Sequence, residues 1–279
     1  MEWPKLKNII LLILLLVNGF LLVLVGTRYT ESVQYERTAL ELTLVRLEAR
    51  GIRVEADRLA SAGDLAPLTV ERDPDRELRM AQALLGGETV QADNRGGGLY
   101  LYQNSSGAVS VRAGGELSAE LTGGPNLSAD GSPERHAAGL LKKMGVDGSQ
   151  IGATEEDGWT RVRFRQTRGG RPLFSCEVEF AYRDDTLRSV QGALLAAPDG
   201  TAERAQSMTL PTALTRFSEE IAATGDVCSA IQSMEPGWRG TVQPMSGGVR
   251  LTPAWLITTD TARYYLDCAT GALARVPDP

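Results

Sequence analysis

The hydrophobic positions of this chain form one continuous apolar run, followed by many shorter periodic segments. Residues 9–25 read IILLILLLVNGFLLVLV and carry no charge. With Gly26 and Thr27, the run approaches the about 20 residues that cross a bilayer as a helix. It is longer than the apolar core of a cleaved signal peptide and lacks a good cleavage site at its end. We therefore expect an uncleaved transmembrane signal-anchor helix over residues 9–27.

The charges beside this run predict its orientation. Lys5 and Lys7 precede it with a single acid, Glu2, whereas acidic and basic residues are balanced after it. Lysine and arginine tend to stay on the cytoplasmic side of a membrane. We therefore expect residues 1–8 to form a cytoplasmic tail and the C-terminal domain to be extracellular, in a single-pass protein. This location argues against chemistry that depends on cytosolic ATP or NADH.

Beyond the run, helical spacing gives way to alternating strands. Apolar residues recur at helical spacing over residues 31–50, and Gly51 follows, which predicts a stalk helix. Asp73 and Pro74 predict the start of a second helix, as N-cap and first helical residue, that ends at Gly86. Short alternating segments between turn residues then predict strands, followed by a linker. The strands are expected at 88–92, 98–103, 107–112 and 116–121, and the linker at 122–132.

The second half of the chain shows an internal repeat. A helix is predicted from Pro133 to Gly145, a strand opens at Gly158-Trp159, and Gly169-Gly170 makes a turn. The same signals return about 78 residues later, which indicates a repeated unit of one helix and a three- or four-stranded antiparallel meander. Chance coincidence in a glycine-rich chain is the alternative. The returning signals are Pro211, Gly225, Gly237-Trp238 and Gly247-Gly248, and residues 74–121 are a candidate third, shorter copy.

These elements predict an α+β fold. The N-terminal single transmembrane helix is followed by extracellular repeats, each with one helix packed on an antiparallel β-meander. The expected parts are a stalk helix with an N-terminal subdomain over 28–125, one repeat over 132–200 and another over 208–279.

Composition and candidate chemistry favour a non-enzymatic protein. The net charge of −6 argues against nucleic acid as a partner. The chain has one histidine, His136, in a predicted first helical turn, so metal and triad chemistry are not expected. Acidic runs at 155–157, 184–185 and 219–220 could supply paired carboxylates for glycoside hydrolysis, but at predicted turns or on a helix face they are more typical of solvated charge. We expect no catalytic residue, no metal and no cofactor.

Two further features leave alternatives open. Arg161, Arg163 and Arg165 alternate along one predicted strand, which is typical of the wet face of a half-buried sheet but could also form a cationic stripe. Cys228 and Cys268 could pair in an oxidising exterior, whereas buried free thiols are the simpler interpretation of three cysteines, the third being Cys176.

The apolar run itself contains the candidate binding residues. Asn18 is a polar amide near its middle, and Gly19 and Gly26 lie seven residues apart on one helical face. Small residues let helices approach closely, and an amide can hydrogen-bond across the contact. We therefore expect a partner helix to contact Asn18, Gly19, Phe20, Leu22 and Gly26. The alternative is a single tolerated asparagine.

Several stretches resemble a known family. The chain begins Met-Glu-Trp-Pro-Lys-Leu-Lys-Asn-Ile-Ile, continues with Asn-Gly-Phe-Leu-Leu at 18–22, and has Gly-Ile at 51–52. These features resemble the YycI type of two-component-system regulatory protein. The run from Leu251 through Trp255 and Tyr264-Tyr265 to Gly271 is similar to the closing strands of YycI and YycH, and to PepSY-type modules.

The resemblance implies a regulator in the cell membrane of Gram-positive-type bacteria. It would bind the cell-wall-sensing histidine kinase YycG, also called WalK, in a heteromer with a YycH-like single-span protein, and bias the kinase between signalling states. An alternative from a different class is a PepSY-like exported domain that inhibits a peptidase or binds envelope polymer. An envelope hydrolase using 155–157 is a third possibility.

Overall fold

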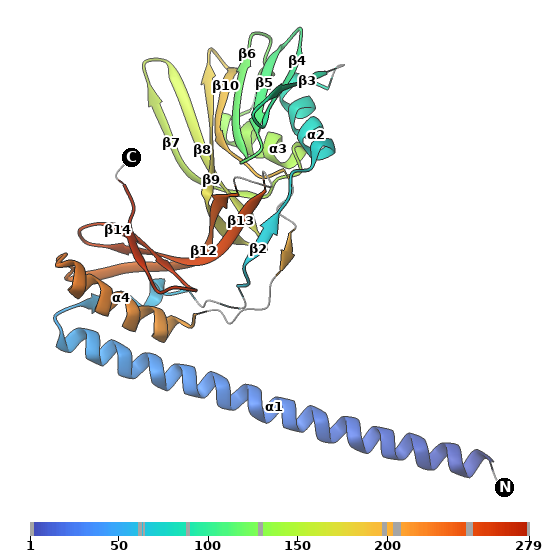
Figure 1. Ribbon diagram of the computed structural model, residues 1–279, viewed down its shortest axis with the longest axis vertical. Helices are drawn as coiled ribbons and strands as arrows, with labels where there is room; N and C mark the ends of the chain where they lie inside the picture. Colours follow the sequence, from blue (N-terminus) through green and yellow to red (C-terminus); the bar gives the residue numbers. More distant parts are fainter. Residues whose placement is uncertain are drawn as a thin grey trace.

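The protein is described by a computed structural model in which one long helix flanks a body of sheet and shorter helices (Figure 1). The structure describes residues 3–60, 63, 65–87, 90–127, 131–196, 200–202, 208–243 and 248–277. Parts of the predicted strand 88–92, the linker 122–132 and the turn at Gly247-Gly248 lie outside these described residues.

Helix α1 spans Trp3–Ala49 and ends, as predicted, before Gly51, which has a positive φ of 83°.

Eight strands form a continuous antiparallel arrangement in the order β3-β4-β5-β6-β10-β9-β8-β7. The N-terminal meander β3–β6 and the following meander β7–β10 meet edge to edge, where β6 pairs with β10. The strands are β3 Gln91–Gly96, β4 Leu99–Asn104, β5 Gly107–Arg112, β6 Glu116–Leu121, β7 Gly148–Glu156, β8 Trp159–Arg168, β9 Arg171–Arg183 and β10 Thr186–Ala193.

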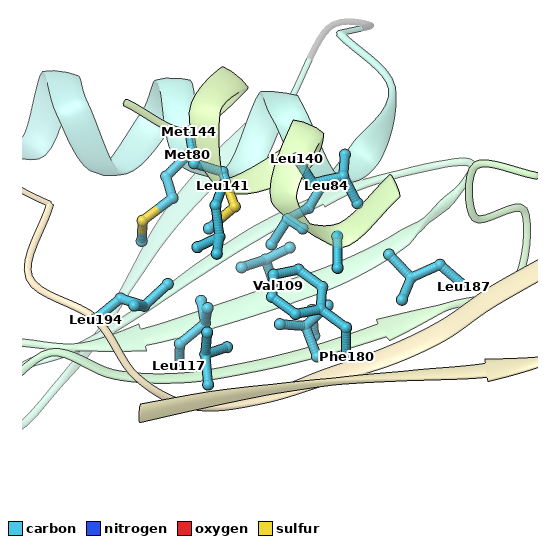
Figure 2. Close-up of a cluster of buried hydrophobic side chains, with 14 of the residues drawn as sticks. Met80, Leu84, Val109, Leu117, Leu140, Leu141, Met144, Phe180, Leu187 and Leu194 are labelled. Carbon is cyan, nitrogen blue, oxygen red and sulfur yellow. The ribbon is translucent and has the colours of Figure 1, made fainter. Parts of the chain in front are cut away.

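Two helices, α2 (Pro74–Leu85) and α3 (Pro133–Lys143), cover one face of this arrangement. Their apolar sides meet the inward side chains of the strands in the largest core of the described residues (Figure 2). Met80 and Leu84 of α2 and Phe180 of β9 are fully buried there. Both helices start as predicted, because the side chains of Asp73 and Ser132 accept hydrogen bonds from backbone N–H groups of the first turn.

A second group of strands surrounds the long hairpin β12 (Ala230–Val242) and β13 (Val249–Thr259). Helix α4 (Leu210–Thr224) packs on one face, with Trp255 and Tyr264 buried in the core beneath it. Strands β2, β11, β14 and β15 extend the β13 side, and β1 pairs in parallel with β12. The remaining elements are β1 Arg53–Val54, the 3-10 helix Ala56–Arg58, β2 Leu68–Val70, β11 Thr201–Ala202, β14 Arg263–Asp267 and β15 Leu273–Arg275.

The predicted fold class is wrong, because the meanders are not separate repeats behind a membrane helix. Across the described residues, all 15 strands belong to one large mixed sheet, in which β9 joins the two groups by pairing with β12 at Leu173 and Trp238. Strand edges expose unpaired N–H and C=O groups, so pairing edge to edge stabilises the meanders as one sheet. Which edges meet depends on residues far apart in the chain.

The prediction that Gly237-Trp238 opens a strand is also wrong. The matching dipeptide Gly158-Trp159 does begin a strand, with Gly158 in the β7–β8 turn at a φ of 74°. Gly237, in contrast, lies in the middle of β12, where a Cβ would stand 2.4 Å from the carbonyl oxygen of Pro172. The first glycine supplies turn geometry and the second supplies space between strands.

The predicted transmembrane span is corrected by the structure as well. Among the helices of the described residues, none is both long enough and apolar enough to cross a membrane. The predicted span over 9–27 is therefore wrong on this finding. Two predictions that depended on this span are wrong as well. They are the single-pass localisation with a cytoplasmic tail at 1–8 and the membrane-embedded mode of partner binding.

Candidate functional site

The most unusual surface of the described residues is the N-terminal part of α1. It extends past the body of the protein (Figure 1). The large apolar side chains between Ile10 and Leu22 are 49% to 76% exposed. Contiguous exposed apolar surface of this kind marks an interaction site in a folded protein. The chain therefore carries a candidate binding surface on α1.

The residues predicted to contact a partner lie on this helix. Phe20 and Leu22 are 66% and 76% exposed, and a Cβ on Gly19 would meet no described atom within 4 Å beyond its chain neighbours and the local backbone of its own helix. The amide nitrogen of Asn18 donates to the carbonyl oxygen of Leu14 at 2.9 Å, within the same helix. That bond occupies one of the two amide hydrogens, so the amide keeps a donor for another molecule. Gly26 is helical, but its surroundings lie outside the described residues.

The other end of α1 is fixed to the body. Leu47 is 1% exposed and packs in one core with Leu214 and Phe217 of α4, while Leu40 and Leu44 pack against the same core. Arg50, just after the helix, donates to the hydroxyl of Ser218 at 2.6 Å. The exposed apolar segment and the part of the chain that packs on α4 therefore belong to one continuous helix.

His136 has a structural role in the described geometry. Its Nδ1 lies 2.9 Å from the hydroxyl of Tyr182, and the two rings meet edge to face. Burial, with a smaller effect of the Lys143 charge, lowers the pKa of His136 below its ordinary value. Burial also raises the pKa of Tyr182, so the pair stays uncharged near neutral pH. The contact joins α3 to β9.

The acidic run 155–157 lies at the β7–β8 hairpin with all three side chains exposed. Asp157 adopts a positive φ of 52° in the turn, as aspartate does more readily than most residues. Within the described part of the chain, no group of three or more His, Cys, Asp or Glu side chains is placed to hold a metal ion. The run has the geometry of a solvated turn.

The arginines of β8 form the wet face of the sheet. Arg161 and Arg165 alternate with the buried Val162 and Phe164. Arg161 pairs with Glu179 at 2.9 Å and Arg165 with Glu177 at 2.6 Å, both across to β9. Since these cross-strand pairs offset the positive charge, the alternation is explained by sheet stabilisation rather than by a cationic stripe. Arg163 is exposed between them.

All three cysteines are free thiols. Burial raises the pKa of Cys176 to about 12 and the pKa values of Cys228 and Cys268 to about 11. A thiol with a raised pKa is protonated near neutral pH and is a poor nucleophile. The cysteines therefore behave as small apolar residues, and the possible Cys228–Cys268 pairing is not formed.

A buried polar cluster lies between the two groups of strands and could not be recognised from the sequence. Arg72, between β2 and α2, holds the carboxylate of Glu77 with bonds of 2.9 and 2.5 Å, and the hydroxyl of Tyr102 donates to the same carboxylate at 3.1 Å. Burial, then the charge of Glu77, raises the pKa of Tyr102 to about 12. The members belong to three different elements. Only the short spacing of Arg72 and Glu77 could have suggested a pair.

Comparisons with known proteins leave the family open. No protein-family model matches the chain, and no curated protein matches it in sequence. Among solved structures, the C-terminal domain of Bacillus megaterium YpeB is 13% identical, with a TM-score of 0.35, and the alignment covers 75% of this chain and 100% of that domain. A TM-score of this size does not establish a shared fold. The resemblances to YycI and to PepSY-type modules therefore rest on the residues quoted above.

Proposed function

We propose that this protein is a non-enzymatic regulator that acts by binding another protein, and that the protein it binds is a sensor histidine kinase. The observation that carries the proposal is the exposed apolar segment of α1 from Ile10 to Leu22, on the same helix whose other end packs in the core with α4. The kinase as partner follows from the resemblance of the N-terminal residues to the YycI type.

The geometry suits a regulator because it separates a binding segment from the rest of the molecule. A partner helix packed on Phe20 and Leu22 would bury apolar surface, which stabilises a complex by about 25 cal/mol per Å² before association costs. Helix α1 continues from there to Leu47 in the core beneath α4. The orientation of the body would then be set by the bound partner, and the body could in turn bias the partner between states.

A matched pair of variants tests this proposal. Phe20→Gln/Leu22→Gln removes apolar surface from α1, and Val227→Gln removes an equally exposed apolar side chain from the body, since Leu22 and Val227 are both 76% exposed. We expect the full-length protein to recover a sensor histidine kinase from its native host and to change the autophosphorylation rate of that purified kinase. The α1 variant should lose both effects, and Val227→Gln should keep both.

Other results would contradict the proposal. If the purified kinase autophosphorylates at the same rate with and without the protein, the regulatory role is wrong. If a peptidase or an envelope polymer is recovered instead and its activity or binding changes on addition of the protein, the alternative exported-domain function replaces it. If both variants bind the kinase equally well, the kinase contact lies off α1.

A further inference from the structure

Two arginines face each other at the tip of the β8–β9 hairpin. Arg168 ends β8, Arg171 begins β9, and the register of the hairpin pairs them directly. Gly169 and Gly170 form the two-residue loop between them, both with a positive φ, of 55° and 76°. A tight loop of this kind fixes the register of the strands beside it, so the arginines are held opposite each other. Like charges in this position destabilise a pair of strands.

No carboxylate in the described part of the chain forms an ion pair with either residue of this couple. Farther along the same hairpin, Arg161 and Arg165 each pair with a glutamate of β9, at 2.9 and 2.6 Å. Those pairs offset the positive charge of the middle of the hairpin. The tip, in contrast, carries two positive charges without a counterion among the described residues.

One hydrogen-bond donor of Arg168 is also buried and unused. Its Nε has no hydrogen-bond partner among the residues that the structure describes. The guanidinium carbon lies 5.7 Å from the ring centroid of Trp238 in β12, where the indole face attracts the charge but offers no oxygen acceptor. A buried N–H group without an acceptor is unfavourable and rare in folded proteins, so this donor indicates a missing acceptor.

Tertiary contacts hold both arginines in place. A Cβ on Gly63 would stand 3.1 Å from Nη2 of Arg171, so the guanidinium lies close to the backbone there. Trp238, which contacts Arg168, donates from its Nε1 to the carbonyl oxygen of Ala66 at 3.0 Å. The two side chains therefore lie where the hairpin tip, β12 and the segment before β2 come together.

We propose that the tip of the β8–β9 hairpin binds a phosphate group, held by Arg168 from one strand and Arg171 from the other. A guanidinium presents its N–H groups in a planar fork that matches two oxygens of a phosphate. A phosphate monoester carries about 1.5 to 2 negative charges at pH 7, which balances the two arginines better than the single charge of a carboxylate. Free phosphate and a phosphate monoester present the same oxygens. The proposal goes beyond the proposed regulatory function and does not depend on it.

Calorimetric titration of the full-length protein with inorganic phosphate tests the site. We expect saturable binding in a non-ionic detergent at constant ionic strength, set with sodium chloride so that screening of surface charge does not change. Arg168→Gln/Arg171→Gln should raise the dissociation constant at least about tenfold, because both forks are lost. Arg163→Gln/Arg183→Gln removes two exposed arginines from the same strands and should bind phosphate as the original protein does.

A third variant tests the buried donor by itself. Arg168→Lys keeps the positive charge but has no group in place of Nε, so it should also bind phosphate more weakly than the original protein. In chloride buffer without phosphate, Arg168→Gln/Arg171→Gln should unfold at the original urea midpoint or above it, because a repulsive pair has been removed. A lower midpoint would show that the two charges already have a partner within the chain and would overturn the proposal.

Further ligands separate the sources of the phosphate group. Binding of methyl phosphate as well as inorganic phosphate supports a phosphate monoester as ligand, whereas binding of inorganic phosphate alone supports the free ion. The assignment to phosphate is wrong if acetate binds equally well. The site itself is wrong if the original protein binds no phosphate, or if both double variants lose binding equally. It is also wrong if phosphate binds only after Asp64→Asn, because the carboxylate of Asp64 would then be the natural occupant.

Discussion

The buried pair of Arg72 and Glu77 gives the sharpest stability prediction. Glu77 is 4% exposed and accepts two hydrogen bonds from Arg72 and one from Tyr102. The guanidinium also lies 3.3 Å from the ring centroid of Tyr100. Burial by itself would lower the pKa of Arg72, but the hydrogen bond and charge of Glu77 outweigh it and raise that pKa. Glu77→Leu keeps the side-chain volume and leaves a partly buried cation without its counterion.

The expected loss in the free energy of unfolding follows from the burial of the pair. Removing one member of a buried ion pair costs about 3–5 kcal/mol, because the other charge stays desolvated. The side chain of Arg72 is 20% exposed, so water can reach part of it and the lower value applies. We expect Glu77→Leu to lower the free energy of unfolding by about 3 kcal/mol. Arg72→Met/Glu77→Leu removes both charges, and its stability should lie within about 1 kcal/mol of the original protein.

Urea unfolding of the four proteins in this double-mutant cycle measures the effect. A coupling energy above about 2 kcal/mol is expected, since the double variant recovers most of the loss. Glu116→Leu is the matched control, because Glu116 pairs with Arg112 at 3.1 Å on the surface, where such pairs contribute less than about 1 kcal/mol. The reasoning is refuted if Glu77→Leu costs no more than Glu116→Leu, or if the two single changes simply add.

Three other perturbations test the remaining contacts. Leu47→Ala should lower the free energy of unfolding by about 3 kcal/mol, because it opens a cavity between α1 and α4; an unchanged urea midpoint would show that α1 is not held there. Gln166→Leu should cost about 3 kcal/mol, since its side chain pairs both the N–H and the C=O of buried Leu195, and thermal unfolding measures the loss. Because the pKa of His136 is lowered in the folded protein, the unfolded chain binds the proton at a higher pH than the folded one does. The free energy of unfolding should therefore fall as the pH drops below about 6.5. His136→Gln should remove this part of the pH dependence, as measured by urea midpoints at about pH 7.5 and about pH 5.5.

Local chemistry in the sequence was sufficient for the helix starts. Asp73 and Ser132 are followed by proline, and each caps its helix with a side-chain oxygen. Gly86 ends α2 in a left-handed conformation with a φ of 89°. These signals act through atoms within one turn of the chain, so they can be recognised without knowledge of the fold.

Strand β7, by contrast, was not predicted. Of the residues from Gly148 to Glu156, only Gly152 is partly buried, so the segment has no alternation of apolar and polar side chains. It is a strand because its backbone pairs with β8 along its length. Backbone hydrogen bonds of an edge strand do not depend on side-chain type, so periodicity could not reveal it.

The candidate site on α1 likewise has features that the sequence reveals and features that depend on tertiary contacts. Local patterns are sufficient to recognise the apolar segment between residues 9 and 25 and the helix that continues to Gly51. Which side of α1 packs on α4, which side stays exposed, and which β-meander edges join into one sheet depend on contacts in the folded chain. Capping, turns and helical spacing act between near neighbours, whereas the burial of Leu47 and the pairing of β6 with β10 require residues that meet only after folding.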